Sequence, residues 1–470
     1  MSLLTVEQFA EITQARYELA GTGRKPSFYL EPFTPSTDSR TLERGETFVC
    51  LRGPNFDGHR FVADAVGRGA RGVVAEENAQ LPDGLGVPVL RVDDAKRAYV
   101  VGAGTARMMA GRCTVVGVTG SVGKTTVKSM CAQLLGTGRV TIETPENENN
   151  ELGVSKACYE LDKWTQAAVI EMGARAPGEI AELVEIAAPE IGVLTNVGEA
   201  HLEFYESREQ LALTKFALFS RGAKAVLSAA DEWSRRLASA SDIERSAVWV
   251  RLCGDPRTQG LTLEAGVPKD GAVPLTFGSS HALAPWRLVG EHHLRDALLA
   301  AGAAILAGMP FEKVAALIGT LELPAGRFEQ HVLASRAIVI YDAYNASPTS
   351  VASALNAFAE VPATRRIAVL GSMAELGADA PAQHEVTGAA AARSGIDALY
   401  CGGAFAERLA AGARGAGMPS DSISLFADNA GVAARLRELI GDGDVVLLKG
   451  SRVQRMEEIL AALIGDGNAS

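Results

Sequence analysis

Short apolar runs alternate with helical patterns along almost the whole chain, and this alternation restricts the fold more than any other feature of the sequence. Strands separated by helices form parallel sheets, because each helix carries the chain back to the edge where the previous strand began. We therefore expect an α/β protein with mainly parallel sheets. The sequence predicts strands over 46–51, 72–77, 114–119, 167–173, 191–197, 224–228, 337–344, 366–373, 398–403 and 445–450.

The alternation falls into three blocks, which agrees with the roughly 150 residues per domain typical of globular chains. The first block ends near Gly111, and the segment "LPAGRFE" (323–329) marks the second boundary. A Gly- and Pro-rich stretch over 261–289 predicts a small antiparallel piece before a helix over 293–306. The expected domains are 1–111, 112–327 and 328–470.

Composition excludes several classes of partner. A net charge of −11 argues against nucleic acid or an anionic membrane as the main partner. The six cysteines are scattered without a CxxC pair, which favours reduced thiols and no structural zinc. No stretch reaches the roughly 18 consecutive apolar residues of a membrane span, and the first 20 residues resemble an amphipathic helix rather than a signal peptide. We expect a soluble, cytoplasmic protein.

The loop "GVTGSVGKTTVK" (117–128) follows an apolar strand and precedes a helical pattern. It departs from the G-x-x-x-x-G-K-[ST] phosphate loop, because Val118 stands where the first glycine belongs. Its mechanical parts remain: two glycines that let backbone N–H groups face phosphate oxygens, Lys124 as a point charge, and the Thr125 hydroxyl for Mg²⁺. An ordinary glycine-containing turn is the alternative. The pattern favours a nucleotide phosphate site.

Two polar residues follow the next predicted strands. Glu171 ends the apolar run "AAVIEMG", and ligands of open α/β sheets bind at the carboxyl ends of strands. There it can hold Mg²⁺ opposite Thr125, although a plain capping acid remains an alternative. His201, in "TNVGEAHLEFY", can ligate a second metal ion or orient a substrate carboxylate. A histidine after a strand can equally be a loop residue.

Lys215 lies on the apolar stripe of the helical pattern "SREQLALTKFALFS". Burial of an ammonium group lowers its pKa. A neutral amine can react with CO₂ to give a carbamate, whose oxygens suit Mg²⁺. The alternative is a lysine stem that lies along the helix edge with its charge in water.

The third block contains "YDAYNASPTS" (341–350), a strand that runs into a polar loop and then a helix. Asp342 can accept hydrogen bonds from a ribose, and Tyr344 and Asn345 can line a nucleotide base or substrate. "KGSR" (449–452) places Lys and Arg after another strand, a pair suited to a carboxylate or phosphate. Each can be a solvated loop, but together they predict a site that faces the phosphate loop across a cleft.

These motifs resemble those of the Mur ligase family over essentially the whole chain. The similarity rests on "TDSRTLERGETFVCLRGPNFDGHRF", "VTGSVGKTT", "ENENNELGV", "TNVGEAHLEFYESRE", "TKFALF", "GRFE", "DAYNASPTS", "LGSMAELG" and "KGSR". "TGSVGKTT" and "DAYNASPTS" are similar to the branch that adds D-alanyl-D-alanine to a UDP-N-acetylmuramoyl-tripeptide. The Asp-Asn-Pro-Arg motif expected of a branch that adds a diamino acid is absent.

The resemblance implies three domains: an N-terminal domain that binds the UDP substrate, a central P-loop-type ATPase domain and a Rossmann-like C-terminal domain. It implies ATP, two Mg²⁺ ions and an acyl-phosphate intermediate, because a carboxylate must be activated before an amine attacks it. Lys124, His201 and Lys215, the last as a carbamate, are the implied catalytic residues. Thr125, Glu171, His201 and Lys215 are the implied metal-binding residues.

The resemblance also implies the binding residues. The residues implied to bind the nucleotide are Gly120, Ser121, Val122, Gly123, Lys124, Thr125, Thr126, His293, Asp296, Arg327 and Asp342. The residues implied to bind the substrates are Ser39, Arg40, Asn149, Asn150, Tyr344 and Asn345. The segment "FDGH" (56–59) is implied to belong to the uridine-diphosphate pocket. One departure stands out: "GEHHLRD" (290–296) has His293 and Asp296 where the family usually has asparagines near the adenine. Both side chains can still hydrogen-bond an adenine edge.

Two other functions compete with this interpretation. A folate polyglutamate ligase of the same family would not need the N-terminal pocket motif. A non-catalytic nucleotide-binding scaffold would not need Lys124, Thr125, Glu171, His201 and Lys215 together. We also expect a monomer.

Overall fold

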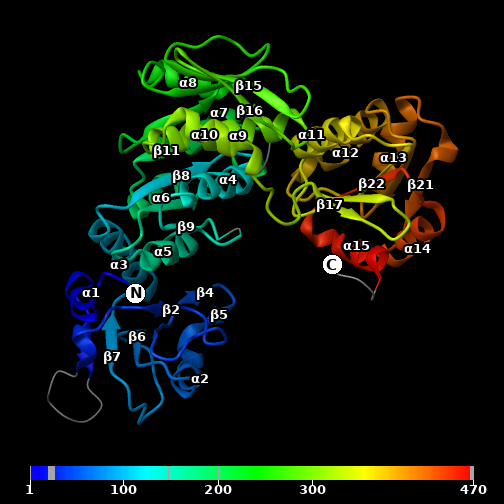
Figure 1. Cartoon of the computed structure of the whole chain (residues 1–470). Helices are drawn as coiled ribbons and strands as arrows, with labels where there is room; N and C mark the ends of the chain where they lie inside the picture. Colours follow the sequence, from blue (N-terminus) through cyan, green and yellow to red (C-terminus); the bar gives the residue numbers. More distant parts are fainter. Residues whose placement is uncertain (1, 19–26, 147, 199–201, 466–470) are drawn as a thin grey trace.

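The computed structural model describes residues 2–18, 27–146, 148–198 and 202–465. Its strands form three α/β sheets that succeed one another along the chain, together with one two-stranded ribbon (Figure 1). Every strand segment predicted from the apolar runs contains a strand, so the expected fold class is confirmed. No helix among the described residues is both long and apolar enough to cross a bilayer.

The N-terminal sheet has the order β1-β7-β6-β3-β2, with β1 antiparallel and the other neighbours parallel. The segment 58–67 forms a 3₁₀ turn followed by a short α-helix. The elements of this part are α1 (Val6–Ile12), β1 (Arg16–Glu18), η1 (Ser27–Leu30), β2 (Pro35–Ser36), β3 (Thr47–Val49), β4 (Arg52–Gly53), β5 (Phe56–Asp57), η2 (Gly58–Phe61), α2 (Val62–Gly67), β6 (Gly72–Glu76), β7 (Val89–Val92) and α3 (Ala95–Met109).

The central sheet has the order β16-β15-β14-β13-β12-β11-β8-β10-β9 and is parallel from β14 to β9. Its last strands confirm the predicted antiparallel piece. The strands are β8 (Thr114–Thr119), β9 (Thr141–Glu143), β10 (Ala167–Glu171), β11 (Ile191–Leu194), β12 (Lys224–Ser228), β13 (Val248–Leu252), β14 (Leu261–Ala265), β15 (Ala272–Phe277) and β16 (Ser280–Pro285). The helices are α4 (Lys124–Gly136), α5 (Glu151–Glu160), α6 (Glu179–Ala187), η3 (Leu202–Phe204), α7 (Arg208–Phe216), η4 (Ala217–Phe219), α8 (Glu232–Ala240), α9 (Glu291–Leu306), α10 (Phe311–Leu317) and η5 (Ile318–Thr320).

The C-terminal sheet has the order β17-β18-β22-β19-β20-β21, with only β17 antiparallel among its described strands. Its strands are β17 (Glu329–Val332), β18 (Ile338–Tyr341), β19 (Arg365–Leu370), β20 (Ala398–Gly402), β21 (Ile423–Phe426) and β22 (Asp444–Lys449). Its helices are α11 (Pro348–Glu360), η6 (Gly377–Asp379), α12 (Ala380–Arg393), α13 (Ala406–Gly415), η7 (Ser420–Ser422), α14 (Asn429–Leu439), η8 (Arg452–Gln454) and α15 (Glu457–Ile464).

Strand order places the site in the central sheet. β8 lies between β10 and β11, so the chain crosses from one side of β8 to the other after β10. Ligands of open α/β sheets bind where the strand order reverses, at the carboxyl ends of the strands. The loop after β8 and the end of β10 therefore occupy the position expected of a binding site.

The N-terminal and central parts share one hydrophobic core. α3 packs on α5 and α6, and the Tyr159 hydroxyl donates to the Tyr99 carbonyl at 2.7 Å. The buried Arg107 guanidinium donates to the Ala187 carbonyl at 2.8 Å. The C-terminal part has cores of its own on the two faces of its sheet. The first two parts are thus packed together, whereas the third is joined mainly through the segment before β17.

Candidate active site

The phosphate loop joins the end of β8 to the start of α4. Gly123, directly before the helix, has φ of 86°, a left-handed conformation that side chains with a Cβ rarely adopt. A Cβ at Gly120 would collide with the Thr195 side chain. No side chain caps the first turn of α4. Its N–H groups and the positive end of the helix dipole therefore face the loop, an arrangement that binds anions.

Two lysines approach the same backbone oxygen. The Nζ atoms of Lys124 and Lys215 each donate to the Gly120 carbonyl at 3.0 Å. Lys215 is 1% exposed, and burial together with the neighbouring Lys124 charge lowers its pKa to about 7. Burial also lowers the pKa of Lys124, against the nearby Glu171 carboxylate. Two lysine side chains that donate to the same carbonyl, one of them buried, form a site that favours anions.

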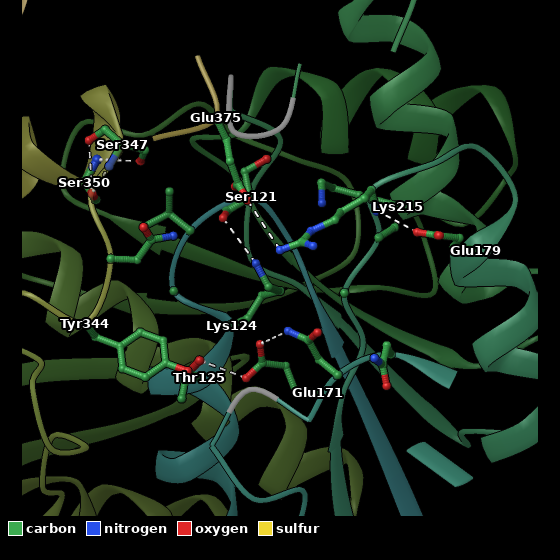
Figure 2. Close-up of a pocket in the computed structure, with 18 of the residues that line it drawn as sticks. Ser121, Lys124, Thr125, Glu171, Glu179, Lys215, Tyr344, Ser347, Ser350 and Glu375 are labelled. Carbon is green, nitrogen blue, oxygen red and sulfur yellow. Dashed lines mark hydrogen bonds and ion pairs between the residues drawn. The ribbon is translucent and has the colours of Figure 1, made fainter. Parts of the chain in front are cut away.

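Glu171 is held in place at the end of β10. Its Oε2 accepts from the Thr125 hydroxyl at 2.8 Å, and its Oε1 accepts from the Asn149 Nδ2 at 2.9 Å (Figure 2). The predicted approach of Thr125 and Glu171 is therefore observed. A buried carboxylate beside a hydroxyl is an oxygen donor pair suited to Mg²⁺, so the residues present fit the implied ion. The carbamate on Lys215 is not tested by this geometry and stays a prediction.

His201 lies outside the described residues, so its predicted role in metal binding stays untested. Among the residues that the structure does describe, no three His, Cys, Asp or Glu side chains are close enough together to hold a metal ion. A metal at Glu171 would accordingly need ligands from phosphate, water or substrate, as is usual for Mg²⁺.

Residues of the C-terminal part and of the segment that joins it to the central part close the other side of the cavity. The Arg327 guanidinium lies 4.4 Å from the centre of the Tyr344 ring, and Figure 2 shows Tyr344 pointing toward Thr125 and Glu171. Within the described part of the chain, the Tyr344 hydroxyl and the Arg327 Nε are buried without a hydrogen-bond partner. Unpaired buried polar atoms are rare, which is consistent with a polar ligand as their partner.

Asp342 and Lys449 form a buried ion pair. The Lys449 Nζ donates to Asp342 Oδ2 at 2.7 Å and to the backbone carbonyls of Asp342 and Asn345 at 3.1 and 3.3 Å. The expectation that "KGSR" offers Lys449 to a ligand is therefore wrong, because all three donors of this ammonium are used within the protein. Lys449 instead fixes the loop that carries Tyr344.

The residues that replace the expected asparagines lie at the start of α9. The Nδ1 of His293 lies 2.5 Å from the Val289 carbonyl, and burial lowers the pKa of His293. The ring is therefore neutral and donates through Nδ1, so that Nε2 is left as an acceptor. Asp296 lies against Gly123, and burial raises its pKa well above the usual range. A protonated Asp296 can donate a hydrogen bond as an asparagine would.

A cavity of about 550 Å³ connects the phosphate loop and Glu171 with Tyr344, whereas His293, Asp296 and Asp342 are not among the described residues that line it. The central part contributes the phosphate loop, the metal-binding candidates and the predicted substrate residues Asn149 and Asn150, the latter also the N-cap of α5. The C-terminal part contributes Tyr344 and Asn345, and the segment that joins it to the central part contributes Arg327. The predicted residues at the cavity are Ser121, Val122, Gly123, Lys124, Thr125, Asn149, Asn150, Glu171, Lys215, Arg327, Tyr344 and Asn345.

The N-terminal candidates lie away from this cavity, in the first sheet and its loops. Ser39 is buried, whereas Arg40 is exposed and pairs with Asp38 at 2.6 Å. In the "FDGH" segment, His59 contacts Asp57 at 2.6 Å and its Nε2 accepts from the Glu76 N–H at 3.1 Å. The structure therefore presents these groups as a separate region that a long substrate would have to reach.

Comparison with known proteins assigns the family. Three family models match in chain order: the Mur ligase family catalytic domain over 36–107, the Mur ligase middle domain over 118–304, and the Mur ligase glutamate ligase domain over 326–452. A protein of Escherichia coli strain K12, named UDP-N-acetylmuramoyl-tripeptide--D-alanyl-D-alanine ligase, is 33% identical over 92% of this chain and 94% of its own. The chain belongs to the Mur ligase family.

Further relatives of this Mur ligase carry the same name. The protein from Synechocystis is 31% identical, with 92% of each chain covered. Among solved structures, MurF from Acinetobacter baumannii superposes with a TM-score of 0.85 at 26% identity over 98% of both chains. MurF from Thermotoga maritima in complex with ADP gives a TM-score of 0.76 at 27% identity over 91% of this chain and 96% of that one. The expected three-domain architecture is thereby confirmed.

Sequence reasoning on this Mur ligase missed two cavity residues. Arg175 and Glu375 form an ion pair at 3.4 Å that joins the central and C-terminal parts. Both follow carboxyl ends of strands, β10 and β19 respectively. Glu375 lies in "LGSMAELG", a motif that contributed to the family resemblance but received no role. Glu375 can be identified from the sequence as a charged residue in a short loop that follows a buried parallel strand.

Proposed function

We propose that this chain is an ATP-dependent, ADP-forming ligase that joins D-alanyl-D-alanine to UDP-N-acetylmuramoyl-tripeptide through an acyl phosphate. The observation that carries the proposal is the position of Lys124 and the buried Lys215 at one cavity wall, opposite Arg327 in the segment that joins the central and C-terminal parts. The names of relatives that align over nine-tenths of the chain supply the substrates.

The nucleotide lies between the central and C-terminal parts in this proposal. The loop and first turn from Gly120 to Thr126 hold the phosphates, with Lys124 at the transferred one. Arg327 neutralises phosphate charge from across the cavity, and Asp342 accepts from the ribose through the oxygen atoms that Lys449 leaves available. His293 and Asp296 contact the adenine. The Thermotoga neighbour in complex with ADP supports this assignment.

Two Mg²⁺ ions are part of the proposal. Thr125 and Glu171 would hold one, and His201 with a carbamate on Lys215 would help to hold the other. When bound, the ions neutralise the phosphate oxygens and bring the donor carboxylate close to them. Support for the carbamate comes from Lys215 itself, because a pKa of about 7 leaves much of the amine neutral, the form that reacts with CO₂.

The protein's part in the chemistry is positioning and charge neutralisation. A carboxylate oxygen of the tripeptide attacks the terminal phosphorus, and the bond from that phosphorus to ADP breaks. The acceptor nitrogen then bonds to the acyl carbon, and phosphate leaves with the former carboxylate oxygen. Lys124 and Arg327 lie where negative charge accumulates in the first step.

We assign the substrates to the remaining candidates. Ser39 and Arg40 bind the uridine diphosphate end, Asn149 and Asn150 face the peptide, and Tyr344 and Asn345 line the acceptor side. The domains are 1–111, 112–327 and 328–470, and the reaction takes place in the cytoplasm, where ATP and UDP-linked sugars are made.

Phosphate release in an omission series tests the proposed function. The complete mixture contains ATP, Mg²⁺, UDP-N-acetylmuramoyl-tripeptide and D-alanyl-D-alanine, and each component is left out in turn. We expect sustained release only in the complete mixture, for a tripeptide ending in lysine or in diaminopimelate. Release that is independent of D-alanyl-D-alanine would contradict the proposal.

A further inference from the structure

Among the described residues, five glutamates line the cavity, and only one of these five comes from the C-terminal part. Glu151, Glu171, Glu179 and Glu182 belong to the central part, whereas Glu375 lies in the loop after β19. Figure 2 shows Glu375 pointing into the cavity from the side opposite Glu171. Its carboxylate therefore faces the phosphate loop from the domain that contributes the acceptor side of the site.

The loop around Glu375 is rigidly anchored. The Met373 N–H donates to Nε2 of the fully buried His384 at 2.8 Å, and the Ser451 hydroxyl donates to the Ser372 carbonyl at 2.8 Å. Glu375 itself has φ of 61°, a left-handed conformation that a residue with a Cβ rarely adopts. Anchors that hold a strained glutamate over a cavity fix the direction of its carboxylate.

Glu375 has a cationic neighbour that other cations can replace. Its Oε1 lies 3.4 Å from the Arg175 guanidinium, and the two side chains are 34% and 70% exposed. Ion pairs this exposed contribute little to stability, because water screens both charges. The negative charge of Glu375 also raises the pKa of Lys124, against the larger effect of burial. The Glu375 carboxylate is therefore close enough to influence the phosphate loop.

The remaining charges near the reacting atoms are unfavourable to an amine substrate. Lys124 and Arg327 suit phosphate and carboxylate groups, and they repel an incoming ammonium group. Glu171 is engaged with Thr125 and Asn149 in the central part. An acceptor that arrives as an ammonium ion therefore needs another carboxylate, on the C-terminal side.

We propose that the Glu375 carboxylate binds the α-ammonium group of the acceptor dipeptide and, once that group has lost a proton to solvent, keeps the lone pair of the resulting amine directed toward the acyl carbon. This inference rests on the proposed function, because it assigns one residue to the acceptor half of that reaction. Glu375 exchanges the Arg175 guanidinium for the ammonium group, while the anchored loop keeps the carboxylate in place. Formation of the acyl phosphate does not require Glu375.

The test compares a charged with an uncharged nucleophile in the variant Glu375→Gln. Hydroxylamine is largely uncharged near neutral pH and can intercept an acyl phosphate as a hydroxamate. We expect the variant to raise the KM for D-alanyl-D-alanine by about tenfold or more, the scale of one lost hydrogen bond to a charged group. Hydroxamate formation and the KM for ATP and for the tripeptide substrate should stay within about twofold of wild type.

Glu182→Gln is the matched control, because Glu182 lines the same cavity but is exposed on α6. It should leave both reactions unchanged. Glu375→Asp keeps the charge on a shorter side chain, so it should raise the KM for D-alanyl-D-alanine less than Glu375→Gln does. An unchanged KM for the dipeptide in Glu375→Gln overturns the inference, and so does an equal loss of the hydroxylamine reaction. Wild-type protein that makes hydroxamate but no dipeptide product would instead contradict the proposed acceptor.

Discussion

At the scale of single residues, Lys215 has the environment that says most about the chemistry. Its side chain is buried, and its Nζ shares the Gly120 carbonyl with Lys124. Burial beside the Lys124 charge stabilises the neutral amine of Lys215 over the ammonium. A residue placed in this way contributes little to folding, so its presence is best explained by function.

Lys215→Ala tests that explanation. We expect turnover to fall by at least about a hundredfold, a loss typical of removing one charge-stabilising group, and to recover in part when formate or acetate is added. The small carboxylate would supply the oxygen atoms that the carbamate provides. The measurement is phosphate release in the complete mixture with and without the added acid.

Lys156→Ala serves as the control, because Lys156 is exposed on α5 and pairs with Glu148 at 3.0 Å. It should keep wild-type turnover and show no response to the acid. Wild-type activity in Lys215→Ala would rule out a role in holding metal.

The helical stripe placed Lys215 on the apolar face but left open a stem that lies along the helix edge with its charge in water, and the structure shows the side chain buried. The approach of Thr125 to Glu171 was predictable, since both stand at carboxyl ends of neighbouring strands. The pair of Asp342 with Lys449 was not, because it joins residues 107 positions apart whose strands become neighbours only in the folded sheet. Pairings between distant loops depend on strand order, which local patterns do not contain.

At the scale of elements, the turn from β8 into α4 depends on its glycines. In Gly120→Ala the new Cβ would meet Thr195, and the backbone has φ of 151°, which disfavours any residue with a Cβ. We expect the variant to weaken binding of a non-hydrolysable ATP analogue by more than about tenfold. Calorimetric titration would measure the change.

Gly136→Ala is the control for this turn, since Gly136 ends the same helix and a Cβ there would meet open space. It should bind the analogue normally and be stabilised by about 0.4–1 kcal/mol. Equal affinities for the two variants would refute the importance of the turn.

The α12 helix couples stability of the C-terminal part to pH through His384. Burial lowers the pKa of His384, so the ring stays neutral in the folded protein while it gains a proton in the unfolded chain. The unfolded state then binds more protons below about pH 6.5, and the free energy of unfolding falls as the pH decreases through that point. Above it, neither state is protonated and the contribution is constant.

His384→Gln should reveal this coupling. Near pH 7.5 the variant should be less stable by about 1–3 kcal/mol, because the Met373 N–H loses its acceptor. The difference from wild type should shrink as the pH falls from about 6.5 toward 5. Thermal unfolding followed across this range would show it, and a constant difference would exclude His384 as the titrating group.

Elements with strong periodicity were predictable, and short or polar ones were not. The strands β8 and β12 agree with the predicted bounds residue for residue, because both are continuous apolar runs. The strand β17 was taken as part of a boundary, since Glu329, Gln330 and His331 give it almost no apolar signal. The strand β17 is stabilised by its antiparallel pairing with β18, which the sequence pattern does not indicate.

At the scale of the whole molecule, the three parts are joined unequally. The N-terminal and central parts share a core through α3, α5 and α6. The C-terminal part is joined through the segment 323–328, where Gly326 and Phe328 both have left-handed backbones, and by contacts such as Arg175 with Glu375. A few residues with unusual φ between two rigid bodies are typical of a hinge.

We expect the C-terminal part to close on the other two when ligands bind. Lys124 and Asp342 lie on opposite sides of the hinge and must reach the same nucleotide. The radius of gyration from small-angle X-ray scattering should decrease on addition of a non-hydrolysable ATP analogue, Mg²⁺ and the tripeptide substrate. The variant Lys124→Ala should not respond, and a wild-type radius that stays constant would contradict closure.

Three sheets and their order of succession could be predicted from the alternation of patterns, but the relative placement of the parts could not. The shared core between α1, α3 and α5 involves residues such as Phe9, Tyr99 and Tyr159, which appear in the sequence as ordinary apolar positions. Nothing in their local pattern says which domain they contact.

The account depends on the transfer of one carboxylate oxygen of the tripeptide to phosphate. The direct measurement uses UDP-N-acetylmuramoyl-tripeptide with both oxygens of its reacting carboxylate labelled with ¹⁸O, incubated with ATP, Mg²⁺ and D-alanyl-D-alanine. Mass spectrometry should find one labelled oxygen in each phosphate released and one in the new amide. Unlabelled phosphate would show that water attacks ATP instead, and the central claim would fail.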